Sequence, residues 1–510
     1  MTTPDHLTVH ADVIGDRTAI IDDRGEGAVR SLDFAGLNAL ANRVANGLAG
    51  LGIGPEDHVA WWGPNSLETM VAIHAIRKAG AVSVPIPYRS TDDEAVYLLD
   101  NADVKALIVD DDYAGAAAIA AASVPALEIV IVFGGDGVDG QLRWDDVLGD
   151  EATPASESRV DATRTMIYTS GTTGRPKGAV RKVGGAANQF GGLLELLGWD
   201  ELDPLIFLTT GPLYHSGPSG FALRAQLVGG TVVTQRHFDA EDWLRLVATH
   251  RVSATFSAPT PIRRICSLPD EVKGRYDVSS MRTMIANAAP WTMTLKQAYL
   301  ADFPADSLWE VYGSTELSVC TALAPADQLR KPGSCGLPAP GVEIRLYDDD
   351  GAIVDTPGVP GELYARSAGL FETYHRAHDR YLDDHRDGFQ TVGDIAYRDD
   401  EGYLYICDRK KDMILTGGVN VYPAEVENVL DAHPAIAEVA VLGMPDEEWG
   451  EAVCAVVVPA GPITADDVVA YARTHLSGPK CPKRVVLVDE LPKTGTGKVL
   501  KRQIRDDLTA

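Results

Sequence analysis

Cysteine is scarce in this sequence of 510 residues. The six cysteines lie far apart and form no CxxC pair; they are Cys266, Cys320, Cys335, Cys407, Cys454 and Cys481. A structural zinc site or a disulfide framework needs cysteines at short, regular spacings. The spacing therefore argues against both, and we expect the protein to work in the reducing cytoplasm.

Long apolar runs are lacking too. The most apolar long stretch, residues 116–133, contains Pro125 and Glu128, so it predicts a helix followed by a strand and not a membrane span. The opening residues, MTTPDHLTVHADV, have neither a basic start nor an apolar run, and we expect no signal peptide. Integral membrane association is therefore not expected.

An excess of positive charge is also missing. Asp and Glu number 73 against 45 Lys and Arg, which gives a net charge of -28. Such a field repels nucleic acid, so we expect no nucleic-acid partner. An anionic substrate would need a local cationic pocket, and cationic side chains are dense between residues 480 and 505.

The length and the hydrophobic pattern predict more than one domain. Single cores stop growing near roughly 250–300 residues. Near the N-terminus, helices expected at 33–50 and 66–80 alternate with strands expected at 58–62, 81–85 and 107–109, which favours a largely parallel α/β sheet. A hairpin is expected from 344–347 and 361–366. A small α+β unit follows, with helices at 423–433 and 465–476 and strands at 438–443 and 452–458. The boundary is expected at the basic cluster 409–412, giving domains 1–409 and 410–510.

The strongest chemical signal is the run YTSGTTGRPKG at residues 168–178. Glycines let backbone N–H groups approach an anion, hydroxyl groups add donors, and a lysine adds charge. The run therefore predicts a phosphate-binding loop, formed by Thr169, Ser170, Gly171, Thr172, Thr173, Gly174 and Lys177. It differs from the P-loop pattern GxxxxGK[ST], because Pro176 stands where the second glycine is required. No GxSxG nucleophile motif is present in the sequence either.

This run resembles the signature loop of the adenylate-forming superfamily, which includes acyl-CoA synthetases, adenylation domains and luciferases. Further motifs follow in the family's order over nearly the whole chain: VYGSTE at 311–316, TVGD at 391–394, DRKKD at 408–412, GGVNVYP at 417–423 and PKTGTGK at 492–498. Six motifs in order make the resemblance specific. It implies a large α/β N-terminal domain, with parallel α/β subdomains and a small β-barrel-like subdomain, and a small α+β C-terminal domain.

The resemblance implies a role for each motif. Glu316, with Thr169, would hold Mg²⁺, a hard cation that prefers oxygen ligands. Asp394 and Arg409 would bind the ribose, and Tyr312 would stack on adenine unless it is a core residue. The other nucleotide-site residues implied are Asn287, Ala288, Gly313, Ser314 and Thr315, with an asparagine at 287 where the family usually has glycine.

Six further positions are implied in the chemistry that follows nucleotide binding. His215 resembles the family's acyl-site histidine, although a lone histidine is more often structural. Lys498 would bridge the substrate carboxylate and the α-phosphate, and Lys411 occupies the hinge position. The path of the CoA thiol arm would be lined by Gly417, Gly418 and Val419.

The resulting hypothesis is an acyl-CoA ligase that uses ATP, Mg²⁺ and CoA. The acid expected is medium-length, branched or alicyclic, a steroid-derived acid included, because residues 217–222 are rich in small side chains; an aryl acid is the alternative. Residues 180–185 depart from the family's Thr-His-containing stretch, which leaves the acyl class open. A carrier protein as acceptor and a nucleotide-binding regulator with an inactive site are the competing hypotheses, and a homodimer is left open.

Overall fold

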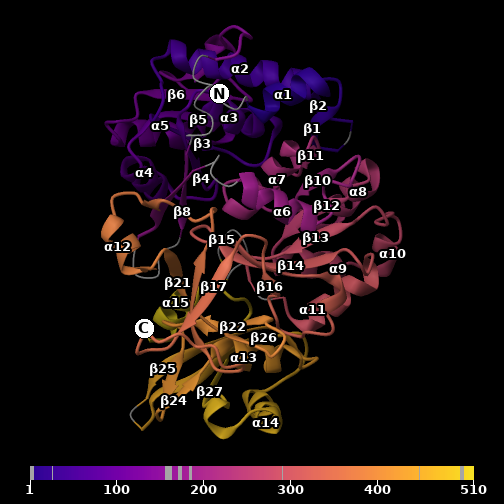
Figure 1. Ribbon diagram of the computed structural model, residues 1–510, viewed down its shortest axis with the longest axis vertical. Helices are drawn as coiled ribbons and strands as arrows, with labels where there is room; N and C mark the ends of the chain where they lie inside the picture. Colours follow the sequence, from indigo (N-terminus) through magenta and orange to yellow (C-terminus); the bar gives the residue numbers. More distant parts are fainter. Residues whose placement is uncertain are drawn as a thin grey trace.

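The computed structural model describes residues 5–25, 27–154, 164–169, 175–182, 187–289, 291–446, 448–493 and 499–509. Within these ranges the strands form four sheets, and the chain runs from two large sheets through a third, smaller one to a fourth near the C-terminus (Figure 1). The described α-helices are α1 (His6–Val13), α2 (Phe34–Gly50), α3 (Leu67–Lys78), α4 (Asp92–Asn101), α5 (Ala114–Ser123), α6 (Ala187–Leu196), α7 (Ser216–Leu227), α8 (Ala240–His250), α9 (Pro259–Cys266), α10 (Asp270–Lys273), α11 (Met293–Asp302), α12 (His378–Asp383), α13 (Pro423–Asp431), α14 (Ala465–His475) and α15 (Lys501–Thr509).

The two large sheets are parallel in their centres and antiparallel at one or both edges. The first has the order β16 (Leu337–Pro338), β15 (Ser318–Leu323), β14 (Leu308–Ser314), β13 (Thr283–Ala286), β12 (Ala254–Ser257), β10 (Ile206–Thr209), β11 (Thr231–Thr234), β1 (Thr18–Asp23), β2 (Val29–Asp33). The second has the order β19 (Thr373–Tyr374), β9 (Lys177–Lys182), β8 (Arg164–Thr169), β4 (Val82–Ile86), β3 (His58–Trp62), β5 (Val104–Asp110), β6 (Ile129–Phe133), β7 (Leu142–Arg143). The predicted parallel α/β architecture is confirmed.

Helix α3 lies between the two large sheets. It contacts β3 and β4 of the second sheet and β1 of the first, and all its residues except Glu68 are buried. A helix covered on all sides is buried around its whole circumference, and the buried residues of α3 include His74, Arg77 and Lys78 besides the apolar ones. Ser66 caps its first turn by accepting a hydrogen bond from the Thr69 amide.

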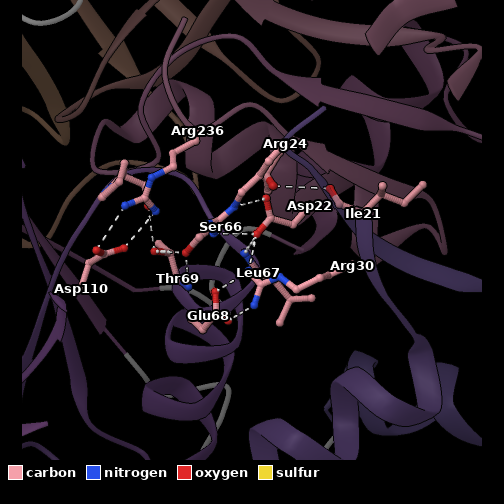
Figure 2. Close-up of polar contacts among 12 residues, drawn as sticks. Ile21, Asp22, Arg24, Arg30, Ser66, Leu67, Glu68, Thr69, Asp110 and Arg236 are labelled. Atoms are coloured by element: carbon pink, nitrogen blue, oxygen red, sulfur yellow. Dashed lines mark hydrogen bonds and ion pairs between the residues drawn. The ribbon is translucent and has the colours of Figure 1, made fainter. Parts of the chain in front are cut away.

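Ion pairs at the start of α3 join the two sheets (Figure 2). Arg30 of β2 contacts both Glu68 of α3 and the buried carboxylate of Asp22 in β1. Although burial opposes it, the hydrogen bonds from Arg24 and Arg30 hold the pKa of Asp22 below its usual value. Arg236, just after β11, pairs with Asp110 at the end of β5 at 3.0 Å. These contacts link strands of the first large sheet to α3 and to β5 of the second.

The third and fourth sheets follow along the chain. The third contains β17 (Glu343–Tyr347), β18 (Gly361–Arg366), β21 (Phe389–Arg398), β20 (His385–Arg386) and β22 (Leu404–Arg409), all antiparallel. The fourth contains β24 (Val419–Val421), β23 (Ile414–Thr416), β26 (Gly450–Pro459), β25 (Ile436–Asp446) and β27 (Arg484–Leu487). The predicted hairpin and the predicted helix and strand pairs of the C-terminal unit are present, with ends that differ by a few residues.

The apolar cores of these two sheets are separate. Leu404 and Ala396 belong to the core of the third sheet, whereas Ile414 and Val453 belong to that of the fourth. This separation agrees with a boundary at 409/410, which stays a prediction. No helix within the described ranges is long and apolar enough to cross a bilayer. All six cysteines are free thiols.

Candidate active site

One cavity of about 580 Å³ lies among the large sheets, α7 and residues that follow β14. Its wall brings together most of the predicted residues that the structure describes. Those that line it are Thr169, Lys177, His215, Asn287, Ala288, Gly313, Ser314, Thr315, Glu316 and Arg409. Its volume lies in the range of small-molecule sites, roughly 300–1,000 Å³.

Glu316 occupies the turn between β14 and β15 and is 7% exposed. Its Oε1 accepts hydrogen bonds from Thr169 Oγ1 at 3.1 Å and from the Tyr374 hydroxyl at 2.9 Å. The Lys177 ammonium lies 5.7 Å from the centre of the Tyr374 ring. Strands β8, β9 and β19 therefore bring two hydroxyl groups and a cation close to the Glu316 carboxylate at one end of the cavity.

The predicted phosphate loop connects β8 to β9. Thr169 and Lys177 are directly paired in the antiparallel register of β8 and β9. Ser170, Gly171, Thr172, Thr173 and Gly174 lie outside the described residues. Their phosphate-binding role stays a prediction. Thr169 and Lys177, which lie on either side of them in the sequence, line the cavity.

The turn after β14 is held by close backbone packing. A Cβ at Gly313 would lie 2.0 Å from the Ser318 carbonyl oxygen, so no other residue fits there without moving the backbone. Ser318 adopts a φ of 64°, and the Ser314 hydroxyl accepts a hydrogen bond from the Leu317 amide at 3.1 Å. Thr315 is linked to Ser216 of α7 at 2.9 Å between hydroxyl oxygens. The turn thus holds Glu316 against the start of α7.

His215 immediately precedes α7. Burial, reinforced by the positive charge of Arg89, lowers the pKa of His215 to about 4, so the ring is neutral near pH 7. Its Nε2 is buried and has no hydrogen-bond partner among the described residues. Asn65 fixes the approaching loop, since its amide donates to Gly211 O at 3.0 Å and accepts from the Leu213 amide at 2.8 Å. His215 therefore lines the cavity with a neutral ring, and one buried ring nitrogen has no partner among the described residues.

Two other predicted residues pair with each other. Tyr312 donates from its hydroxyl to Asp394 Oδ2 at 2.6 Å, and burial, followed by Asp394, raises the pKa of Tyr312 so that this proton is retained. Arg409, opposite Asp394 on β22, places its Nε 3.4 Å from Asp394 Oδ1. Arg409 lines the cavity, whereas Tyr312 and Asp394 are not part of its described wall. Their roles at ribose and adenine stay predictions.

Asn287 and Ala288 follow β13. The Asn287 amide donates to Val311 O at 2.5 Å and so joins the ends of β13 and β14. Ala288 has a φ of 72°, an uncommon conformation for a residue with a Cβ and one that clusters at functional sites. The asparagine thus has a structural role at a position where the family usually has glycine.

The hinge and CoA-path residues lie outside the cavity wall. Lys411 is in the turn between β22 and β23, and burial lowers its pKa. Gly417 and Gly418 form the β23–β24 turn with φ of 57° and 80°. A Cβ at Gly417 would meet the Trp449 ring at 2.7 Å, while one at Gly418 would meet nothing within 4 Å. Val419 is 41% exposed.

Lys498 lies outside the described residues. Lys493 and Val499 on either side of its loop form an antiparallel bridge, and the Leu500 amide donates to Pro492 O at 2.9 Å. The Lys493 ammonium also pairs with Glu438 of β25. The stem of this loop is therefore attached to the fourth sheet.

Sequence reasoning missed three contributors to the site. Tyr374 supports Glu316 from β19, and Arg181 and Arg224 add two cations to the cavity wall. The arginine at 181 falls in the stretch that departs from the family's pattern, which was the one signal available. Nothing in the local pattern marked Tyr374 or Arg224.

Comparison with known proteins identifies two matching family models. Residues 7–375 match the AMP-binding enzyme model, and residues 425–498 match the model of the AMP-binding enzyme C-terminal domain.

Two curated relatives and one solved structure are similar along nearly the whole chain. A feruloyl-CoA synthase of an Amycolatopsis species is 36% identical over 93% of this chain and 94% of its own. The 3-[(3aS,4S,7aS)-7a-methyl-1,5-dioxo-octahydro-1H-inden-4-yl]propanoyl:CoA ligase of Rhodococcus jostii is 34% identical over 99% and 98%. ATP-bound MatB from Rhodopseudomonas palustris superposes with a TM-score of 0.86 at 30% identity, covering 98% of each chain.

Proposed function

Because the chain belongs to the family of AMP-binding enzymes, we propose that it is an AMP-forming acyl-CoA ligase. It activates a carboxylic acid with ATP to acyl-AMP and pyrophosphate, and then transfers the acyl group to CoA with release of AMP. One observation carries this proposal: a single cavity joins Thr169, Lys177 and Glu316 to His215. The relatives named above act as CoA synthases and ligases, which supports the same reaction.

The chemistry needs positioning more than a protein nucleophile. A carboxylate is a poor acyl donor, because its leaving group would be oxide. Attack of a carboxylate oxygen on the α-phosphorus breaks the bond to pyrophosphate and makes AMP the later leaving group. The thiol sulfur of CoA then attacks the acyl carbon, loses its proton, and expels AMP. The enzyme's task in the first step is to hold two anions together and stabilise the charge on the phosphate oxygens.

The described side chains suit this task. Lys177 and Arg409 supply positive charge to the cavity wall, and Lys498 is proposed to bridge the carboxylate and the α-phosphate. The neutral His215 is proposed to hold the substrate carboxylate through its buried nitrogen. A neutral donor orients the carboxylate without lowering its nucleophilicity as much as a cation would.

The donor set near Glu316 fits Mg²⁺. Glu316 Oε1 and Thr169 Oγ1 are oxygen atoms 3.1 Å apart that could serve as ligands, and Mg²⁺ usually takes one or two protein oxygens, with water and phosphate completing its shell. No group of three or more His, Cys, Asp or Glu that could hold a metal ion occurs in the part of the chain that the structure describes. The ion would neutralise phosphate charge. We propose Glu316 and Thr169 as its holders.

The second half-reaction is proposed to use the C-terminal domain, residues 410–510. It would turn about Lys411 after adenylation and bring Gly417, Gly418 and Val419 to the thiol arm of CoA. Support comes from the separate apolar cores and from the open space around Gly418. Asp408 joins the hinge to α13 by accepting a hydrogen bond from the Ala424 amide at 3.1 Å. We also propose a cytoplasmic location, supported by the free cysteines.

The proposed test measures AMP release from purified protein with ATP, Mg²⁺ and a panel of acids, with and without CoA. A CoA ligase releases AMP only when both acid and CoA are present. A ligase with another acceptor exchanges pyrophosphate with each good acid but gives no CoA-dependent AMP. An inactive nucleotide-binding regulator binds ATP and does neither, which would refute the proposal.

A further inference from the structure

Arg263 connects a helix of the first large sheet to the fourth sheet. It lies in the last turn of α9, which begins shortly after Phe256, a residue of β12 that lines the cavity. Its Nη1 donates to the Ala437 carbonyl of β25 at 2.9 Å, and its Nη2 lies 3.7 Å from Asp431 Oδ1. Because 174 residues separate Arg263 from Ala437, this contact depends on how the two parts of the chain are oriented.

Both acceptors suit a cation that comes from another part of the chain. The register of β25 and β26 shifts between Ile436 and Glu438, and in these two described strands Ala437 has no partner on β26. A bulge leaves its extra residue without ladder hydrogen bonds, so the Ala437 carbonyl is available to Arg263. Asp431 is the last residue of α13, and its side chain is 8% exposed. A carboxylate is disfavoured at a helix C-terminus and when buried without a partner, so the guanidinium group compensates it.

The contact lies close to the attachment point of the segment that contains Lys498. Glu438 follows Ala437 directly in β25, and its Oε2 accepts a hydrogen bond from the Lys493 ammonium at 2.7 Å. Lys493 forms one side of the antiparallel bridge that frames this segment. Arg263 therefore holds β25 at the residue next to the one that binds Lys493.

The orientation that this contact maintains does not suit the second half-reaction as proposed above. The residues proposed for the CoA path, 417–419, lie outside the cavity wall. They and β25 belong to the same sheet, so a turn about Lys411 that brings this path to the cavity also moves β25 away from α9. The contact with Arg263 must break in that turn.

We propose that Arg263 is a positioning residue for acyl-AMP formation. By binding β25 and the end of α13, it docks the proposed C-terminal domain, residues 410–510, in the orientation in which Lys498 is proposed to act. Its release accompanies the turn to the second half-reaction. This inference rests on the proposed function, because it assumes both half-reactions and the role of Lys498. The docked fraction can fall only by the factor with which the contact stabilises it, so the expected effect is moderate.

The test replaces Arg263 by methionine, which removes both contacts and keeps an apolar side chain of similar length. Pyrophosphate exchange measures adenylation, and conversion of supplied acyl-AMP and CoA measures the second half-reaction, both with the panel acid that the wild type uses best. We expect exchange to fall about tenfold, as for the loss of a hydrogen bond from a charged donor, while conversion of acyl-AMP stays at the wild-type rate or rises. Arg263→Lys keeps the charge and should keep part of the exchange rate. Equal loss of both half-reactions, or unchanged exchange, would overturn the inference.

Two further variants control for effects on the fold. Arg264→Met is the matched control, because Arg264 lies in the same last turn of α9, with its Cζ 5.4 Å from the centre of the Phe238 ring. It should leave exchange unchanged, and a loss equal to that of Arg263→Met would contradict the proposal. Asp431→Asn approaches the contact from the other side and should lower exchange about two- to threefold, since a partly exposed ion pair contributes little. It carries the test if Arg263→Met fails the thermal-unfolding check.

A double variant then assigns the effect to Lys498. If Arg263 acts by placing Lys498, Arg263→Met should add less than about twofold to the loss of exchange that Lys498→Ala causes. Losses that multiply would show that the two residues act independently and would refute the positioning role. Absence of CoA-dependent AMP release from the wild type with every acid would instead count against the proposed function.

Discussion

Replacement of Glu316 by glutamine tests the catalytic cavity most directly. The change keeps the size of the side chain and leaves an oxygen that can accept hydrogen bonds from Thr169 at 3.1 Å and Tyr374 at 2.9 Å. It removes one negative charge from a site that is 7% exposed. The turn after β14 should therefore keep its shape while the site loses its charge.

The size of the effect follows from that charge. Two unit charges about 4 Å apart interact by about 4 kcal/mol at an effective dielectric near 20, or about three powers of ten in rate. Part of the loss is recovered because water can take the place of one metal ligand. We expect Glu316→Gln to slow acyl-AMP formation about 100-fold and to raise the Mg²⁺ concentration needed for half-maximal rate.

Pyrophosphate exchange across a Mg²⁺ titration measures this effect. Tyr374→Phe is the geometric control, since it removes one hydrogen bond to Glu316 but keeps the carboxylate, and should cost no more than about tenfold. Glu372→Gln is the charge control, because Glu372 pairs with Arg164 and Lys182 outside the cavity. An unchanged rate for Glu316→Gln at every Mg²⁺ concentration, or an equal loss in Glu372→Gln, would refute the reasoning.

Three other predictions address the second domain and the histidine. Lys498→Ala should slow acyl-AMP synthesis by about two to three powers of ten. The variant should still convert supplied acyl-AMP and CoA to acyl-CoA. Equal loss of both half-reactions would contradict the proposed role of Lys498 in adenylation. Lys411→Pro should block thioester formation, because proline fixes φ near −65° and so prevents rotation at this residue. It should spare pyrophosphate exchange, because the Lys411 amide donates no hydrogen bond within the described ranges that proline would remove. Full thioester turnover would refute the hinge. His215→Asn should change how the stability of the fold depends on pH. Because the pKa of His215 is lowered to about 4 in the fold, against about 6.5 in the unfolded chain, the unfolded state takes up the proton first as the pH falls. The stability that the wild type has above pH 6.5 is therefore lost progressively toward pH 4. The gap in unfolding free energy between wild type and variant should therefore shrink by up to about 3 kcal/mol between pH 7 and pH 4 in urea titrations, and a constant gap would contradict the pKa shift.

The elements were predictable where local signals are strong. Ser66 caps α3 and Asp33 caps α2, as their positions before apolar helices indicate. The strand at His58–Trp62 has the predicted ends. These features depend on neighbours in sequence, which a single sequence contains.

Contacts between distant segments were not predictable in the same way. The pairing of Tyr312 with Asp394 requires β14 and β21 to approach, and the bond from Tyr374 to Glu316 requires β19 to extend the sheet beyond β9. Hydrophobic periodicity describes one element at a time and contains no information on which sheets meet. The positions of Arg181 and Arg224 on the cavity wall could not be predicted either, because β9 and α7 meet only after the second sheet packs on the first.

Sheet topology explains why motifs far apart in the chain still converge. Parallel strands β10, β12, β13 and β14 are neighbours in the first sheet, and His215, Asn287 and Glu316 all follow the carboxyl ends of strands in that group. Adjacent strands lie about 4.8 Å apart, so residues separated by about a hundred positions in sequence come within about 15 Å. Ligands of open α/β sheets bind at this end of the strands. Thr169 reaches the same place from the other large sheet, through the end of β8. The cavity therefore depends on how the two large sheets, joined by α3 and its ion pairs, lie relative to each other. Mutations in these ion pairs, remote from the chemistry, should alter the spacing between Thr169 and Glu316.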